Sequence, residues 1–232
     1  MESLDFQTIR ALDSFAQQYP FFDTLFRTSD GHLFRTVPIV ALAWWAWFAP
    51  SKKTETNRER VVATLLVCFV AIVVAKLLSI SLPFRARPLA IPGLVSRFPN
   101  GSALALEAMS SFPSDHAVLF FSLSVGLAAV SLPVGVYSIV HTIVLVCLPR
   151  IYLGMHYPTD IVAGAFIGSG MGWAGSTRTV SSILAKLPMR LLRANPGVFY
   201  ALLFVMTFLI GTVGADVRRI VEGLLRLLAG RN

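Results

Sequence analysis

Apolar residues gather in six runs along the chain, each long enough to cross or nearly cross a membrane. A transmembrane helix needs about 17–25 predominantly apolar residues, and the runs lie at residues 33–49, 60–82, 116–132, 134–152, 158–176 and 197–215. No internal repeat or low-complexity linker separates them. The pattern predicts an all-α, polytopic membrane protein with about six transmembrane helices in one bundle, and residues 1–232 as a single membrane domain.

Two further segments combine helical spacing of apolar residues with charges between them. They are residues 3–26 and residues 216–230, one near each end of the chain. A helix with one apolar and one charged face is typical of the membrane surface. We therefore expect interfacial amphipathic helices at both ends of the bundle.

The run at residues 158–176 also contains glycines at a regular spacing. Gly164, Gly168 and Gly172 recur every four residues, so they share a helix face that a neighbouring helix can approach closely. We interpret this face as packing within one subunit, with a dimer interface as the alternative. The oligomeric state stays open.

Composition supports a membrane protein, and membrane topology explains the basic charge better than a nucleic-acid partner does. Hydrophobic residues make up 55% of the chain and charged residues 14%, with a mean hydropathy of +0.70. Many cations lie in the loops expected at residues 50–59 and 177–196, which the positive-inside rule assigns to the cytoplasm. Four arginines after the last apolar run argue for the opposite orientation.

Polar clusters occur in the segments that join the runs on the other, non-cytoplasmic face. His156 and Asp160 stand four residues apart, and Pro158 suits the first turn of a helix that begins there. A carboxylate can then lie beside the imidazole and make it more basic. The alternative is a capped helix with a histidine at the membrane surface. Ser114 or Asp115 can likewise cap a helix, whose N-terminus attracts anions.

Cations complete the pattern around these clusters. Arg85, Arg87 and Arg150 carry guanidinium groups that match phosphate oxygens, although lipid headgroups would attract them as well. Lys76 lies inside the second apolar run, where a charge is costly unless it faces protein or reaches the polar end. His141 lies midway along the fourth run with no evident partner, and we interpret it as structural. Cys68 and Cys147 form no disulfide framework.

In this order and on one face, the clusters resemble the three-part signature of the type-2 phosphatidic acid phosphatase superfamily. Arg150, His156 and Asp160 match the third part in spacing, with proline at the position of the usual serine. "PSDH", residues 113–116, matches the second part, with aspartate where many members have glycine. Arg87 and its following proline match the first part, but the lysine expected with six residues between it and Arg87 is replaced by isoleucine, and Lys76 lies one helical turn deeper.

The resemblance implies a metal-independent phosphatase without a cofactor. His156 would attack phosphorus and form a phosphohistidine, Asp160 would hold its other nitrogen, and His116 would protonate the leaving group. The phosphate oxygens would be bound by Arg87, Ser114, Arg150, Lys76, Arg85 and Asp115.

The resemblance also suggests a substrate, because "SFPSDHA" is similar to the bacterial undecaprenyl-diphosphate phosphatases. We expect a membrane lipid phosphatase of the bacterial inner membrane, with its site facing the periplasm or exterior. Alternatives are a phosphatase or phosphotransferase for phosphatidylglycerol phosphate, phosphatidic acid or lipid A, and a non-catalytic lipid-phosphate binder or transporter. Loop 89–112 suits a lid or a lipid entrance, in which Arg97 and Glu107 would contact a headgroup unless they are simply solvated.

Overall fold

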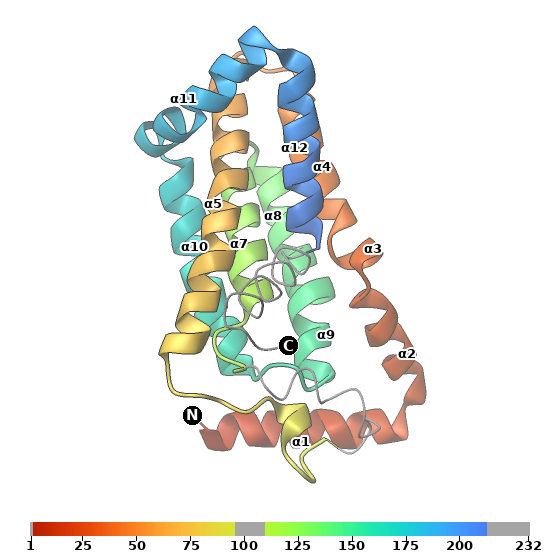
Figure 1. The fold of residues 1–232 in the computed structure, drawn as a ribbon. Coiled ribbons are helices and arrows are strands. Elements are labelled where there is room, and N and C mark those ends of the chain that lie inside the picture. Colours follow the sequence, from red (N-terminus) through yellow and green to blue (C-terminus); the bar gives the residue numbers. More distant parts are fainter. Residues whose placement is uncertain (1, 96–109, 213–232) are drawn as a thin grey trace, which may run out of the picture.

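A computed structural model describes residues 2–95 and 110–212 of the chain, and within these ranges all regular structure is helical (Figure 1). The elements are α1 (Glu2–Gln18), α2 (Pro20–Ser29), α3 (His32–Arg35), α4 (Val37–Phe48), α5 (Thr54–Ser81), the short 3-10 helix η1 (Pro88–Ala90), α7 (Asp115–Ala128), α8 (Leu132–His141), the π-helical turn η2 (Thr142–Cys147), α9 (Leu148–Tyr152), α10 (Pro158–Ser176), α11 (Arg178–Ala194) and α12 (Pro196–Gly211).

The helices form a bundle with two distinct ends. Helix α7 packs against α5, α8 and α10, while α1 lies across one end of the bundle and α11 lies at the other (Figure 1). The turn between α4 and α5 is at the α11 end, and α10 begins at the α1 end. Segments 50–59 and 150–160 are therefore at opposite ends, as predicted. Which end faces the cytoplasm stays a prediction.

Two helical stretches of the described residues are long and apolar enough to cross a membrane. They are Thr54–Ser81 and Leu132–Tyr152, the second of which combines α8, η2 and α9. Leu33–Phe48, Asp115–Ala128 and Pro196–Gly211 are shorter apolar helices. The all-helical prediction is confirmed for the described residues, and the crossing number of six stays a prediction.

The segment 177–196, which was expected to be a loop, is instead the amphipathic helix α11. Ser181, Ala185 and Met189 repeat every four residues on its buried face, and the helix packs against α5. Ile183 and Leu187 are exposed on the opposite face. The basic residues that suggested a loop are thus carried on a helix, because one face of it has a protein partner.

The amphipathic segment predicted at residues 3–26 is divided between α1 and α2, and one face of α1 is covered by protein. Asp5, Ile9, Asp13 and Ala16 are all buried. The interpretation of α1 as a helix that only lies on the membrane was therefore incomplete. The second amphipathic helix, at residues 216–230, and residues 96–109 of the expected lid, with Arg97 and Glu107, lie outside the described residues.

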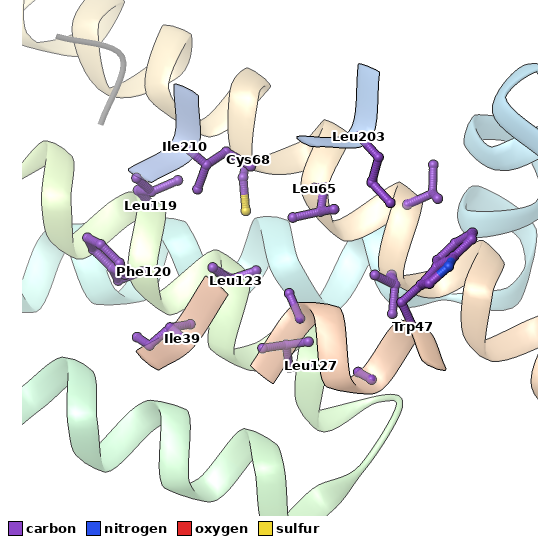
Figure 2. Close-up of a cluster of buried hydrophobic side chains, with 14 of the residues drawn as sticks. Ile39, Trp47, Leu65, Cys68, Leu119, Phe120, Leu123, Leu127, Leu203 and Ile210 are labelled. Atoms are coloured by element: carbon purple, nitrogen blue, oxygen red, sulfur yellow. The ribbon is translucent and has the colours of Figure 1, made fainter. Parts of the chain in front are cut away.

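An apolar core holds α4, α5, α7 and α12 together (Figure 2). Burying a large apolar side chain contributes about 1.5–3 kcal/mol, and α7 supplies four such residues to the centre of the cluster: Leu119, Phe120, Leu123 and Leu127. Trp47, near the end of α4, is only 1% exposed. Its ring stacks on Phe199, with centroids 5.2 Å apart. The cluster fixes α7, whose N-terminus carries His116.

The glycines of α10 lie directly against the backbone of α7, which supports the interpretation as packing within one subunit. A Cβ atom built on Gly168 would lie 2.2 Å from the carbonyl oxygen of Val118, and one on Gly172 would lie 2.4 Å from that of Ser122. A Cβ atom on Gly164 would lie 2.7 Å from the carbonyl oxygen of Ser114. Because these neighbours are backbone atoms, they cannot move aside cheaply.

We expect Gly168→Ala to destabilise the protein, because the added methyl group must separate α10 from α7. Overpacking of this kind typically costs about 1–3 kcal/mol. Gly170→Ala is the matched control on the same helix, since a Cβ atom there meets nothing within 4 Å. Thermal unfolding in detergent should show a clear loss for the first variant and none for the second. Equal midpoints would contradict this packing arrangement.

Candidate active site

The predicted site residues come from four segments that meet at the α1 end of the bundle. The loop after α5 carries Arg85 and Arg87, the first turn of α7 carries His116, α9 carries Arg150, and the turn before α10 carries His156. All except Arg85 are at most 8% exposed. Buried charged and polar groups need partners, so the hydrogen bonds among these residues define the site.

A hydrogen bond to the imidazole ring fixes the orientation of His156. The backbone reaches it through Gly154, whose φ of +68° lies in the left-handed region that favours glycine. Nδ1 of His156 lies 2.8 Å from the carbonyl oxygen of Ser111. A carbonyl oxygen only accepts, so Nδ1 carries the proton and Nε2 carries the lone pair. Nε2 lies 3.5 Å from Nη1 of Arg87, which places an unprotonated nitrogen beside a guanidinium group.

Asp160 contacts His156 less directly than expected. Its Oδ2 atom is 3.8 Å from Nδ1 of His156, so the carbonyl of Ser111 is the closer partner. Oδ2 instead accepts a hydrogen bond of 2.8 Å from the backbone N–H of Tyr157, and Oδ1 accepts one from Arg85. Asp160 therefore caps α10 and places a negative charge near the imidazole.

The charges around His156 favour its neutral form. Burial lowers the pKa of His156 below its ordinary value; Asp160 opposes this shift, while Arg87 and Arg150 add to it. A charged imidazole loses more hydration on burial than a neutral one does, which explains the direction of the pKa shift. A neutral imidazole with a lone pair on Nε2 is the form that can act as a nucleophile.

His116 is held at both ring nitrogens. Nδ1 lies 2.7 Å from Oδ1 of Asp115, and Nε2 lies 2.8 Å from Nη2 of Arg150. Since guanidinium only donates, Nε2 accepts in this arrangement. Asp115 was predicted among the phosphate-binding residues, but here its carboxylate orients His116. Burial and Arg150 favour the neutral ring of His116, and the carboxylate of Asp115 favours the protonated one.

The arginines form two pairs with the histidines. Arg87 donates to the carbonyl oxygen of Met155 at 3.1 Å beside His156. Arg150 contacts His116, and its Nη2 atom is also 3.5 Å from Oδ1 of Asp30. Both guanidinium groups are 7% exposed, and guanidinium stays charged even when buried. The site therefore offers two guanidinium groups that could bind an anion.

Three predicted phosphate-binding residues have other surroundings. Ser114 is fully buried, and its hydroxyl group caps α7 by accepting from the backbone N–H of Ala117 at 3.4 Å. Arg85 forms ion pairs with Asp5 and Asp160, and Asp160 links it to His156. Lys76 is exposed on α5, and the described residues offer it neither an ion pair nor a hydrogen bond. The structure does not bring Lys76 together with the histidines.

Several partners of the site were not predicted. The carbonyl group of Ser111 left no signal, because any residue type can supply it. Asp5 had a weak signal, an acid in line with the apolar positions of its helix.

His141, predicted to be structural, does have a partner, since its Nε2 atom lies 3.1 Å from the carbonyl oxygen of Arg35.

The described residues contain no group of three or more histidine, cysteine or acidic side chains that could hold a metal ion. Cys68 and Cys147 are free and buried, as expected from their positions in apolar runs. The candidate site is thus built from two histidines, two arginines and the acids that position them.

Comparison with known sequences matches the part of the chain that carries this site. Residues 84–184 match the sequence model of the PAP2 superfamily, a range that contains both histidines, Arg85, Arg87, Arg150 and Asp160. The predicted resemblance to the type-2 phosphatidic acid phosphatases is thus confirmed for residues 84–184.

A curated relative covers a similar region. The chain is 33% identical over 117 residues to the bacitracin transport permease protein BcrC of Bacillus licheniformis, a match that covers 50% of this chain and 54% of the relative. The chain thus spans about half the length of the curated relative that it matches. No solved structure matches the chain.

Proposed function

We propose that this protein is a membrane lipid phosphatase that hydrolyses undecaprenyl diphosphate to undecaprenyl phosphate. The observation that carries the proposal is the geometry of His156: its Nδ1 proton is bound by Ser111, and its Nε2 lone pair lies beside Arg87. A fixed nucleophile next to a phosphate-binding cation is what phosphoryl transfer requires.

In the proposed reaction, Nε2 of His156 attacks the terminal phosphorus and forms an N–P bond as the bond to the bridging oxygen breaks. Arg87 and Arg150 stabilise the charge on the phosphoryl oxygens. Arg150 must leave Nε2 of His116 to do so, and Asp115 then favours a protonated ring that gives its proton to the leaving oxygen. Water next attacks the phosphohistidine with His116 as the base, and this step releases inorganic phosphate and free His156.

The choice of lipid rests on the "SFPSDHA" stretch and on the proposed location. We place six helices in the bacterial inner membrane, with the α1 end of the bundle at the periplasmic face. A lipid phosphate would enter with its headgroup at the arginines and its tail in the bilayer. Other lipid phosphates, such as phosphatidylglycerol phosphate, phosphatidic acid or lipid A, share this chemistry and belong in the same test.

A second candidate is a lipid-phosphate binder or transporter without turnover. The name of the relative, a bacitracin transport permease protein, favours it. Binding alone would need the arginines but no nucleophile, so the orientation of His156 and the pairing of His116 with Asp115 favour the phosphatase.

We expect the purified protein to release inorganic phosphate from undecaprenyl diphosphate in the presence of a metal chelator. Arginines in place of a metal ion would supply the positive charge, so chelation should leave the rate unchanged. The measurement compares phosphate release across a panel of lipid mono- and diphosphates, with binding measured in parallel. Binding without release from any lipid would support the transporter, and loss of activity with chelator would refute metal independence.

A further inference from the structure

We propose that Asp5, on helix α1, is a positioning residue for the nucleophile, which it reaches through Arg85 and Asp160. The inference rests on the proposed function, because it assigns Asp5 a role in preparing His156 for attack. Asp5 lies outside the segment that matches the PAP2 superfamily, residues 84–184. It would be a part of the active site that the N-terminal helix supplies.

The contacts of Asp5 form one continuous chain to the site. Asp5 is 2% exposed, and its Oδ2 atom lies 2.6 Å from Nη2 of Arg85. Nη1 of the same guanidinium group lies 2.5 Å from Oδ1 of Asp160. Asp160 lies 3.8 Å from Nδ1 of His156. One arginine thus joins the carboxylate of α1 to the carboxylate beside the nucleophile.

Asp5 also fixes the first turn of α10, which follows His156 in the chain. Its Oδ1 atom accepts from the backbone N–H of Thr159 at 3.2 Å, and Oδ2 accepts from the hydroxyl group of Thr159. The first N–H groups of a helix have no partner within the helix, and a negative charge there is stabilising. A residue far away in the sequence therefore caps the helix that presents Asp160.

Helix α1 is held in place by apolar packing around this carboxylate. Ile9, one turn after Asp5, is 2% exposed and belongs to a buried cluster with Leu94 and Tyr157. The rings of Phe6 and Tyr157 are 5.8 Å apart, and the guanidinium group of Arg85 lies 4.1 Å from the centre of the Tyr157 ring. Asp5 is thus fixed relative to Arg85.

The net charge of Asp5, Arg85 and Asp160 favours the proposed reaction. Asp5, Arg85 and Asp160 together carry one net negative charge, which favours positive charge on His156. When Nε2 bonds to phosphorus and Nδ1 keeps its proton, the ring becomes cationic. His156 also faces Arg87 and Arg150, which oppose this charge, and Asp115 on the first turn of α7, which favours it.

The direction of the change in the pKa of His156 can be tested with substitutions of Asp5 and of Arg85. Asp5→Asn keeps an oxygen for the N–H group of Thr159 but leaves Arg85 and Asp160 with no net charge. It should lower the pKa of His156 further, because a nearby negative charge is lost. Arg85→Gln leaves two carboxylates and should raise the pKa of His156. A purely structural disturbance would not shift the pKa in opposite directions.

The experiment is an NMR titration of the full-length protein, labelled at histidine, in detergent, with His156→Gln used to assign the signal. Ile9→Ala is the matched control, since it loosens the same helix face without changing any charge, and it should leave the pKa of His156 in place. Phosphate release should fall about tenfold in kcat for Asp5→Asn, with KM near that of the wild type and the acidic limb of the pH profile moved to lower pH.

Each outcome has a distinct consequence for this inference. An unchanged pKa of His156 in both charge variants, or an equal shift in Ile9→Ala, would overturn the role of Asp5. The titration needs no turnover. A wild-type protein that releases no phosphate but shows the opposite shifts would refute the phosphatase and still support the coupling of Asp5 to His156.

Discussion

Replacing His156 by glutamine should abolish phosphate release from every lipid substrate. The expected loss is at least about 10³-fold in kcat, because removal of a nucleophile that forms a covalent intermediate is among the most damaging single changes to an enzyme. Within the described residues, Nε2 of His156 is the histidine nitrogen of the site whose lone pair faces a guanidinium group without accepting a short hydrogen bond. We expect the wild type, rapidly quenched during turnover of a ³²P-labelled lipid, to retain acid-labile label that the variant lacks.

His141→Gln is the control for this experiment. His141 is also a buried histidine, but it bonds to the carbonyl oxygen of Arg35, and a glutamine amide can donate the same bond. It should keep most of the turnover and the covalent label. Retained turnover in His156→Gln would refute the phosphohistidine mechanism, and loss in both variants, with lowered thermal stability, would show that the effect is structural.

The sequence predicted the parts of the fold that depend on local pattern. Long apolar runs identified α5 and the stretch from α8 to α9, and the glycine spacing identified the face of α10 that packs on α7. The pattern did not reveal α11, because its basic residues suggested a loop on the cytoplasmic side. Its apolar face has meaning only once α5 is known to lie against it.

The residues of the site likewise fall into those that local spacing predicts and those that tertiary contacts bring in. His156 and Asp160 are four residues apart, and Ser114 directly precedes the helix that carries His116, so local spacing sufficed for them. The carbonyl of Ser111 and the carboxylate of Asp5 reach the site through tertiary contacts. Asp5 lies 154 residues from Thr159, to which it bonds. No local pattern encodes such a contact, although an acid on an otherwise apolar helix face was a usable hint.

Substitution of His116 should affect substrates according to their leaving groups. As a general acid, His116 matters most when the departing oxygen would otherwise be a strongly basic alkoxide, as in phosphatidic acid. Undecaprenyl diphosphate releases a phosphate oxygen, which is a much weaker base and needs less help. General acid catalysis contributes typically about 10²–10⁴-fold. We therefore expect His116→Ala to lose that much on phosphatidic acid and clearly less on the diphosphate, measured in single turnovers.

Asp115→Asn separates proton donation from the positioning of Arg150. The variant removes the carboxylate 2.7 Å from Nδ1, which favours a protonated ring, but it keeps Nε2 available to Arg150, 2.8 Å away. If His116 donates a proton, Asp115→Asn should show the same preference for the diphosphate as His116→Ala, with smaller losses. If His116 serves only to hold Arg150, His116→Ala should lose equally on both lipids and Asp115→Asn should lose little on either, because Arg150 binds the phosphoryl oxygens of both substrates alike.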